Sequence, residues 1–249
     1  GLLMYTLKLP RWFGPADTIY AAHHHAGILD LKGGFGSTLA SFISISGGAS
    51  VGIYGPLVHF GATVSSYIRR QQFIPKIPHD IIIGSGVAAA ISAGFGAPLA
   101  GIIFAHETVL RHFSMKAVAA LAISSMAANF SATEIGIVSP PLLLTAIPFD
   151  MGDIIISLGI IGPLAAIVAI LFMKLVIFTG TLPAKINIKN WQAPIIAGFA
   201  CGICGMVFSE VLGLGTDVLM SVITSQLLFG YLFALLLGKL ILTSICIGF

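Results

Sequence analysis

Charged side chains are scarce in this sequence. Of its 249 residues, 12 are lysine or arginine and 9 are aspartate or glutamate, so 8% are charged, against about 25% in an ordinary soluble domain. The net charge of +3 is small, and no basic stripe is interleaved with aromatic residues, which argues against a nucleic-acid partner. The polar and apolar alternation of membrane barrels is missing too. Because 57% of the residues are hydrophobic, the composition predicts an all-α integral membrane protein.

Cysteine is scarce as well. The chain has three, Cys201, Cys204 and Cys246, and all lie in apolar runs. Apolar burial disfavours the thiolate that metals and disulfide exchange require, so we expect small packed residues rather than a disulfide or metal pair. His23 to His25 predict a wet interfacial run, because neighbouring side chains on a helix diverge by about 100° and rarely share one ion. We expect neither a metal nor a cofactor.

Apolar runs of unequal length make up most of the chain. A helix that crosses a hydrocarbon core of ~30 Å needs about 20 residues. The runs that begin near 115, 153, 192 and 218 are long enough to cross, and the last is divisible at Gly230. Runs of about a dozen residues predict half-helices that stop inside the membrane. The runs cover residues 35–51, 57–68, 80–93, 98–110, 115–132, 153–182, 192–212 and 218–247.

Two glycine–proline strings stand at the start of apolar runs. They are Gly52-Ile53-Tyr54-Gly55-Pro56-Leu57 and Gly94-Phe95-Gly96-Ala97-Pro98-Leu99. Glycines just before a proline and an apolar run predict a helix with proline at its first position and unpaired N–H groups in front of it. Such a start binds anions. In a membrane it is tolerated only where protein or a water-filled cavity surrounds it, so we expect a route for a small anion.

Longer segments around both strings resemble one family. Residues 47–61 resemble the segment of the CLC chloride channel and transporter family that is built around Gly-Arg-Glu-Gly-Pro. Residues 94–107 look like the same family's Asn-Ala-Pro-Leu-Ala-Gly helix, which ends in one or two glutamates. The order and the spacing of the two segments both fit, and two long motifs in register are far more specific than either alone.

The resemblance implies an all-α, CLC-like bundle of two inverted repeats with tilted and half-spanning helices. Residues 1–249 would form a single multi-pass membrane domain, with most of the first repeat in 1–135 and the opening of the second in 150–249. The family's third motif, Gly-x-Phe-x-Pro, never arrives after Leu240, which implies an incomplete bundle. The resemblance further implies a homodimer with a chloride path in each subunit. We expect a lipid environment in a bacterial inner membrane.

Two carboxylates of the family are replaced in this chain. Tyr54 stands where the family has the glutamate that gates the anion path and carries protons. Thr108, next to Glu107, stands where it has the inner proton-transfer glutamate. Neither tyrosine, with a reference pKa near 10, nor threonine exchanges protons readily at neutral pH, so the usual route of proton coupling should be lost. The family's Gly-Ser-Gly-Ile-Pro motif is unrecognisable, and ungapped counting puts Phe13 and Gly14 opposite its Ser-Gly.

Passive, uncoupled chloride conduction is therefore the predicted function. The predicted anion-binding residues are Gly52, Ile53, Tyr54, Gly55, Pro56, Phe13 and Gly14. The alternative is a chloride/proton antiporter with an unconventional carrier such as His59, His106 or Glu107, although both histidines are expected to be packed or hydrogen-bonded. A fluoride or nitrate exporter and a scaffold without a pore also stay open.

Two further residues need a separate interpretation. Ser85 lies between two glycines, but no nucleophile frame surrounds it and no histidine can be assigned to it, so we do not expect an enzyme. Lys239 lies near the middle of the last apolar run. Such a charge snorkels, pairs with a carboxylate or adds positive potential to the anion path.

Overall fold

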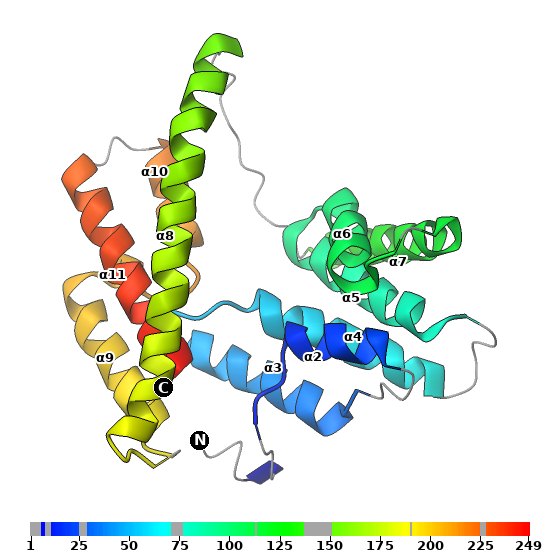
Figure 1. Cartoon of the computed structure of the whole chain (residues 1–249), viewed down its shortest axis with the longest axis horizontal. Helices are drawn as coiled ribbons and strands as arrows, with labels where there is room; N and C mark the ends of the chain where they lie inside the picture. The colour runs from blue at the N-terminus through cyan, green and yellow to red at the C-terminus, as the bar shows by residue number, and fades with distance from the viewer. Residues whose placement is uncertain are drawn as a thin grey trace. The chain divides into compact units, whose positions relative to one another are not determined.

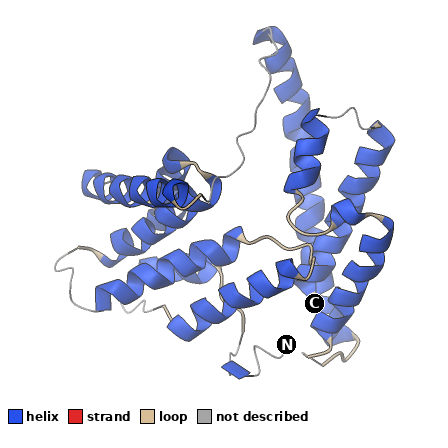
Figure 2. Ribbon diagram, turned by 180° about the vertical axis from the view of Figure 1, so that it is seen from behind, coloured by secondary structure: helices blue, strands red, loops and turns tan. Residues whose placement is uncertain are grey.

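The computed structural model describes residues 6–7, 11–24, 29–70, 77–112, 114–136, 151–189, 191–224 and 228–249. Every regular element within these ranges is a helix (Figures 1 and 2), which confirms the all-α prediction. The chain forms two compact units. The first comprises residues 2–43 and 52–141, and the second comprises Gly1, 44–51 and 142–249. The division into inverted repeats stays a prediction.

The first unit is built around α5 (His79–Phe95), which packs between α4 (Tyr54–Arg70) and α7 (Met115–Glu134). Its core is apolar and fully buried, with Ile83, Val87 and Leu121 all at 0% exposure. The other helices of this unit are α2 (Pro15–His23), α3 (Leu31–Ser46, as far as residue 43), α6 (Pro98–Phe104) and the π-helix η1 (Ala105–Leu110).

Two glycines set the distance between α4 and α5. A Cβ atom on Gly61 would meet the backbone carbonyl oxygen of Gly86, and a Cβ on Gly86 would meet that of Gly61. Only glycine permits so close a backbone approach. The crossing brings Ala62 into the core, where it is 0% exposed.

The two glycine–proline strings open their helices differently. Pro98 is the first residue of α6, after Gly96 has turned the chain at φ 64°, so the prediction for the second string is confirmed. For the first string it is wrong, because α4 begins at Tyr54 and Pro56 is its third residue. Proline fits there since no N–H in the first turn of a helix has an intrahelical partner.

The second unit consists of α8 (Met151–Lys185), α9 (Ala193–Val207), the short 3₁₀ helix η2 (Ser209–Val211), α10 (Thr216–Thr224) and α11 (Phe229–Gly248). α11 packs against both α8 and α9. The Thr179 hydroxyl of α8 donates to the Ser244 carbonyl of α11 at 2.6 Å. Its core contains Cys201, Val211, Leu235 and Leu242.

Three helices within the described residues are long and apolar enough to cross a membrane: Met115–Glu134, Ile155–Lys185 and Gly230–Gly248. They confirm that the runs near 115 and 153 form helices long enough to cross. The predicted division of the last run is confirmed too, because α10 ends at Thr224 and α11 begins at Phe229.

The predicted crossing over 192–212 is wrong. α9 has 15 residues, which is about 22 Å at the usual helical rise. It ends at Val207, and the polar pair Ser209 and Glu210 then turns the chain into η2. The apolar run was continuous enough to hide this interruption.

The surface of α8 is apolar all round. No residue in its most hydrophobic window is buried, and Ile160, Leu164 and Ile167 each expose more than half of their surface. A helix that is hydrophobic on every face belongs in lipid or against other membrane helices. The structure therefore agrees with an integral membrane protein.

Candidate anion site at the start of α4

The start of α4 leaves backbone donors unpaired. The first helical hydrogen bond runs from the Leu57 amide to the Ile53 carbonyl at 2.9 Å. Among the described residues, the amides of Ile53, Tyr54 and Gly55 have no acceptor, and Pro56 has no N–H to offer. These amides lie at the positive end of a helix of 17 residues, an arrangement that attracts anions.

The start of α2 lies directly beside the start of α4. A Cβ on Gly55 would come within 3.5 Å of Cγ of Pro15, and Pro15 is the first residue of α2, after the N-cap Gly14. The structure thus brings together Gly14 and Gly55, two residues that the sequence analysis had placed in one site. The Gly14 amide, however, already donates to Oδ2 of Asp17 at 2.9 Å.

Asp17 is held in its charged form by these contacts. Burial alone would raise the pKa of its carboxyl group, but the hydrogen bond from Gly14 and the ion pair with Arg11 outweigh burial and lower the pKa below its usual value. The Gly14 N–H group at the α2 start is therefore already bound to a resident carboxylate. The backbone amides available to bind a further anion are therefore those at the start of α4.

Phe13 is engaged in packing. Its amide donates to the Ser37 hydroxyl at 2.9 Å. Its ring lies nearly parallel to that of His59, with centroids 6.1 Å apart, and the Arg11 guanidinium lies 5.0 Å from the ring centroid. Neither Phe13 nor Gly14 offers a free amide, so their predicted part in anion binding stays a prediction without a donor to support it.

Tyr54 is the residue predicted to stand where the CLC family has its gating glutamate. Its ring stacks on Phe95, the last residue of α5, with centroids 3.8 Å apart and planes 17° from parallel. Its hydroxyl bonds to no residue that the structure describes, and its position is fixed by the stack. The position thus carries an uncharged ring held against α5 instead of a mobile carboxylate.

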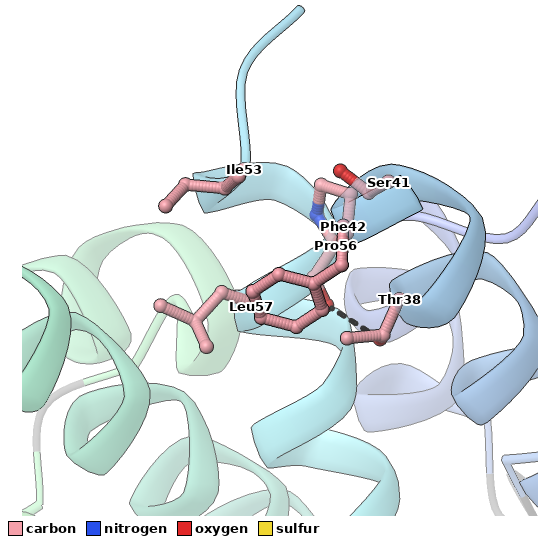
Figure 3. Close-up of a pocket in the computed structure, with 6 residues that line it drawn as sticks. All are labelled: Thr38, Ser41, Phe42, Ile53, Pro56 and Leu57. Carbon is pink, nitrogen blue, oxygen red and sulfur yellow. Dashed lines mark hydrogen bonds between the residues drawn. The ribbon is translucent and has the colours of Figure 1, made fainter. Parts of the chain in front are cut away.

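A small apolar pocket lies beside this helix start (Figure 3). It is lined by Thr38, Ser41 and Phe42 of α3 and by Ile53, Pro56 and Leu57 of α4. The Thr38 hydroxyl donates to the Pro56 carbonyl at 3.3 Å, the dashed line in Figure 3. Oγ of Ser41 is buried and has no hydrogen-bond partner among the residues that the structure describes.

Ser41 is the feature that the sequence analysis missed. A buried hydroxyl without a partner costs about 1–3 kcal/mol, so native structures retain few of them. Nothing in the sequence marks Ser41, since it is one of several serines in an apolar run. Only the packing of α3 on α4 brings it to the predicted motif.

The residues around the second family carboxylate lie on η1. Glu107 is exposed and Thr108 is half-buried, whereas Val109 and Leu110 of the same π-helix are buried. The extra residue per turn of a π-helix shifts which side chains face the core. Glu107 forms no ion pair with any described residue, and Thr108 provides no ionisable group.

His59 is the buried titratable residue of α4. It is 1% exposed, its Nδ1 is 2.9 Å from the Thr18 hydroxyl, and its Nε2 is buried without a partner. It lies one turn beyond Gly55 on the face of α4 that packs against α2. The expectation that His59 is packed and hydrogen-bonded is confirmed.

These observations define a membrane protein of unequal apolar helices, with a glycine-rich helix start that presents free amides. The family model described as "Voltage gated chloride channel" matches residues 3–249. The chain therefore belongs to the voltage-gated chloride channel family, which is the CLC family whose motifs it resembles.

Individual relatives agree with this assignment. The chain is 27% identical over 197 residues to the chloride channel protein CLC-e of Arabidopsis thaliana, which covers 72% of the chain and 27% of the relative. It is 27% identical over 220 residues to the H(+)/Cl(-) exchange transporter ClcA of Klebsiella pneumoniae, covering 82% and 44%. With the transporter of the same name from Vibrio cholerae it shares 25% over 218 residues, covering 82% and 45%. The chain spans less than half the length of these relatives.

Proposed function

We propose that this protein conducts chloride passively across a membrane, without coupled proton movement, along a path that includes the start of α4. The amides of Ile53, Tyr54 and Gly55 are the donors that receive the ion. Stripping chloride of its water is costly in an apolar medium, and a path must replace the lost hydration with dipoles. Three unpaired amides at the positive end of α4 can supply part of that replacement.

The Ser41 hydroxyl supplies a further donor to the same ion. It lines the pocket beside Ile53 and Pro56, and no described residue is its hydrogen-bond partner. Hydroxyl and amide donors carry partial charges only, so an ion held by them can leave again. No lysine or arginine lines this pocket, which favours conduction over tight binding.

One observation supports the proposed absence of proton coupling, namely the stacked ring of Tyr54. A proton carrier in the anion path must bind and release a proton near neutral pH. Tyr54 brings no carboxylate or imidazole to this position, and its ring is stacked on Phe95. Thr108, at the other position, has no ionisable group.

Chloride/proton exchange is the second candidate, and His59 is the observation that favours it. Two relatives bear the name H(+)/Cl(-) exchange transporter. The Nε2 atom of His59 is buried and unpaired one turn from the α4 start, and histidine is the side chain best suited to carry protons at neutral pH. Glu107 is exposed on η1, which makes it the weaker carrier.

The expected setting of this function follows from the family. The chain would act as a homodimer in a bacterial inner membrane, with lipid around the apolar faces of helices such as α8. Each subunit would hold its own chloride path. These statements rest on the CLC resemblance and on the apolar surface of α8.

Parallel recording of chloride and proton movement tests the proposal. The full-length protein is reconstituted in liposomes, a potassium ionophore drives chloride efflux, and a chloride electrode and a pH electrode record both fluxes. We expect chloride efflux without proton uptake, in wild type and in His59→Gln alike. Proton uptake in a fixed ratio to chloride would overturn the proposal, and its loss in His59→Gln would establish the second candidate.

A further inference from the structure

The three cysteines gather in the core of the second unit. Sγ of Cys201 on α9 and Sγ of Cys246 on α11 are 3.0 Å apart, and all three cysteines are free thiols. Cys201 is 4% exposed, whereas Cys204 and Cys246 are half-buried. The pair closes the contact between α9 and α11 without a covalent bond.

A cation lies on the same face of α11 as Cys246. Lys239 precedes Cys246 by two helical turns, and its Nζ donates to the carbonyls of Val211 at 3.0 Å and Gly213 at 2.5 Å. The side chain of Lys239 is half-buried, and no carboxylate whose side chain the structure describes forms an ion pair with it. Its ammonium group interacts electrostatically with the thiols of Cys246 and Cys201, so the cation and the cysteine pair lie in one cluster.

We propose that Cys201 and Cys246 are an oxidisable pair, which a membrane-permeant peroxide converts into a disulfide that ties α9 to α11. Cys246, the more exposed thiol, attacks the peroxide: an S–O bond forms, the O–O bond breaks, and the thiol proton leaves with the second oxygen as water. Cys201 then attacks the sulfenic sulfur of Cys246. An S–S bond forms, the S–O bond breaks, and the hydroxyl leaves with the Cys201 proton as water. Two thiols are oxidised and one peroxide is reduced to two waters.

Helix geometry excludes a disulfide between Cys201 and Cys204. It follows Cys201 by three residues on α9, where side chains at that spacing have Cβ atoms about 5–6 Å apart. A disulfide needs Cβ atoms about 3.5–4.5 Å apart. Cys201 and Cys204 could join only if the helix were distorted, so Cys204 is the matched control.

The disulfide would lie next to the segment that leads to the first glycine–proline string. Thr243 precedes Cys246 on α11, and its hydroxyl is 2.8 Å from the hydroxyl of Ser50. Ser50 is 1% exposed and lies two residues before Gly52. Oxidation would therefore fix the face of α11 that holds this segment.

Thiol counting and peptide mapping test the proposal. The full-length protein in lipid is exposed to hydrogen peroxide at doses that oxidise an exposed control thiol, then denatured, alkylated with a maleimide polymer and digested for mass spectrometry. Wild type should fall from three alkylated thiols to one, Cys204, and should yield a Cys201–Cys246 linked peptide that a reductant removes. Cys204→Ser should yield the same peptide, and Cys201→Ser and Cys246→Ser should not.

Two results would overturn it. One is wild type that keeps all its thiols under these conditions. The other is a linkage through Cys204 or between two chains. Both results are read from the peptide map of the wild-type protein. The test therefore remains decisive even if a cysteine variant fails to fold.

Discussion

Tyr54 places an aromatic ring, and no carboxylate, at the start of α4. Its ring stacks on Phe95 with centroids 3.8 Å apart, and stacked rings contribute about 0.5–1.5 kcal/mol beyond their burial. Tyr54→Glu would return a carboxylate with a reference pKa of about 4.3 to the start of α4. Above that pKa the carboxylate competes with chloride for the free amides, and below it the neutral acid releases them.

We therefore predict that chloride flux through Tyr54→Glu rises severalfold as pH falls from neutral towards 4, while wild type stays flat. Flux assays in liposomes over this pH range measure the effect. Tyr54→Phe is the matched control, because it keeps the ring and removes the hydroxyl, and its profile should be as flat as that of wild type. A flat profile for Tyr54→Glu would show that residue 54 does not line the path.

Substitution of Ser41 tests whether its hydroxyl binds the anion or only packs between α3 and α4. Its buried hydroxyl has no hydrogen-bond partner in the described part of the chain. If the hydroxyl receives chloride, Ser41→Ala loses one hydrogen bond to a charged ligand, worth about 1.5–3 kcal/mol, and chloride affinity should fall roughly tenfold or more. The concentration dependence of flux gives this affinity.

Ser65→Ala is the control for Ser41→Ala. Ser65 lies farther along α4, and its hydroxyl is satisfied by the Ala62 carbonyl at 2.9 Å. We expect its chloride affinity to equal that of wild type. A Ser41→Ala protein that gains stability and keeps its chloride affinity would mean that the hydroxyl is merely an unsatisfied group.

At the scale of the helices, the crossing of α4 and α5 holds the α4 start in place. Gly61→Ala would push a methyl group into the Gly86 carbonyl, and such overpacking costs about 1–3 kcal/mol. We predict a lower free energy of unfolding and lower chloride flux, measured by denaturant unfolding in detergent and by the liposome assay.

Gly202→Ala on α9 is the matched control for the crossing. A Cβ at Gly202 meets nothing within 4 Å, so the substitution gains about 1 kcal/mol of helix propensity and should leave flux unchanged. Equal stability of the two variants would contradict the close approach of α4 and α5.

The sequence predicted some helix starts and lengths correctly and others incorrectly. Pro98 was placed correctly because glycine and proline act locally on the backbone. Pro56 was misplaced by two residues, since proline is tolerated throughout the first turn and the helix begins where the Ile53 carbonyl accepts its bond. The prediction of one membrane-crossing helix over 192–212 was wrong, because a hydropathy average over this run does not register the turn at Ser209 and Glu210.

The residues of the site that the sequence did not predict are those that reach it through contacts between helices. The motif residues Gly52 to Pro56 were found because they are contiguous. Ser41 and the stacking partner Phe95 belong to other helices, and the capping of Gly14 by Asp17 depends on side-chain geometry. No periodicity or spacing encodes such contacts between distant segments.

At the scale of the whole molecule, the account rests on chloride moving alone. The unpaired amides at the start of α4 explain how an anion would be received, but an exchanger needs such a start as well. An exchanger differs from a passive conductor in having a group that carries protons in step with the anion. Tyr54 and Thr108 both lack this ability, whereas His59 has the chemistry but is buried between α2 and α4.

The reversal potential of the full-length protein in a planar bilayer tests this claim most directly. For an ion carried alone, a tenfold chloride gradient sets a reversal potential of about 59 mV, and a pH gradient added across the same bilayer leaves it unchanged. We predict that value at every pH gradient. A reversal potential that moves with the pH gradient would contradict uncoupled conduction.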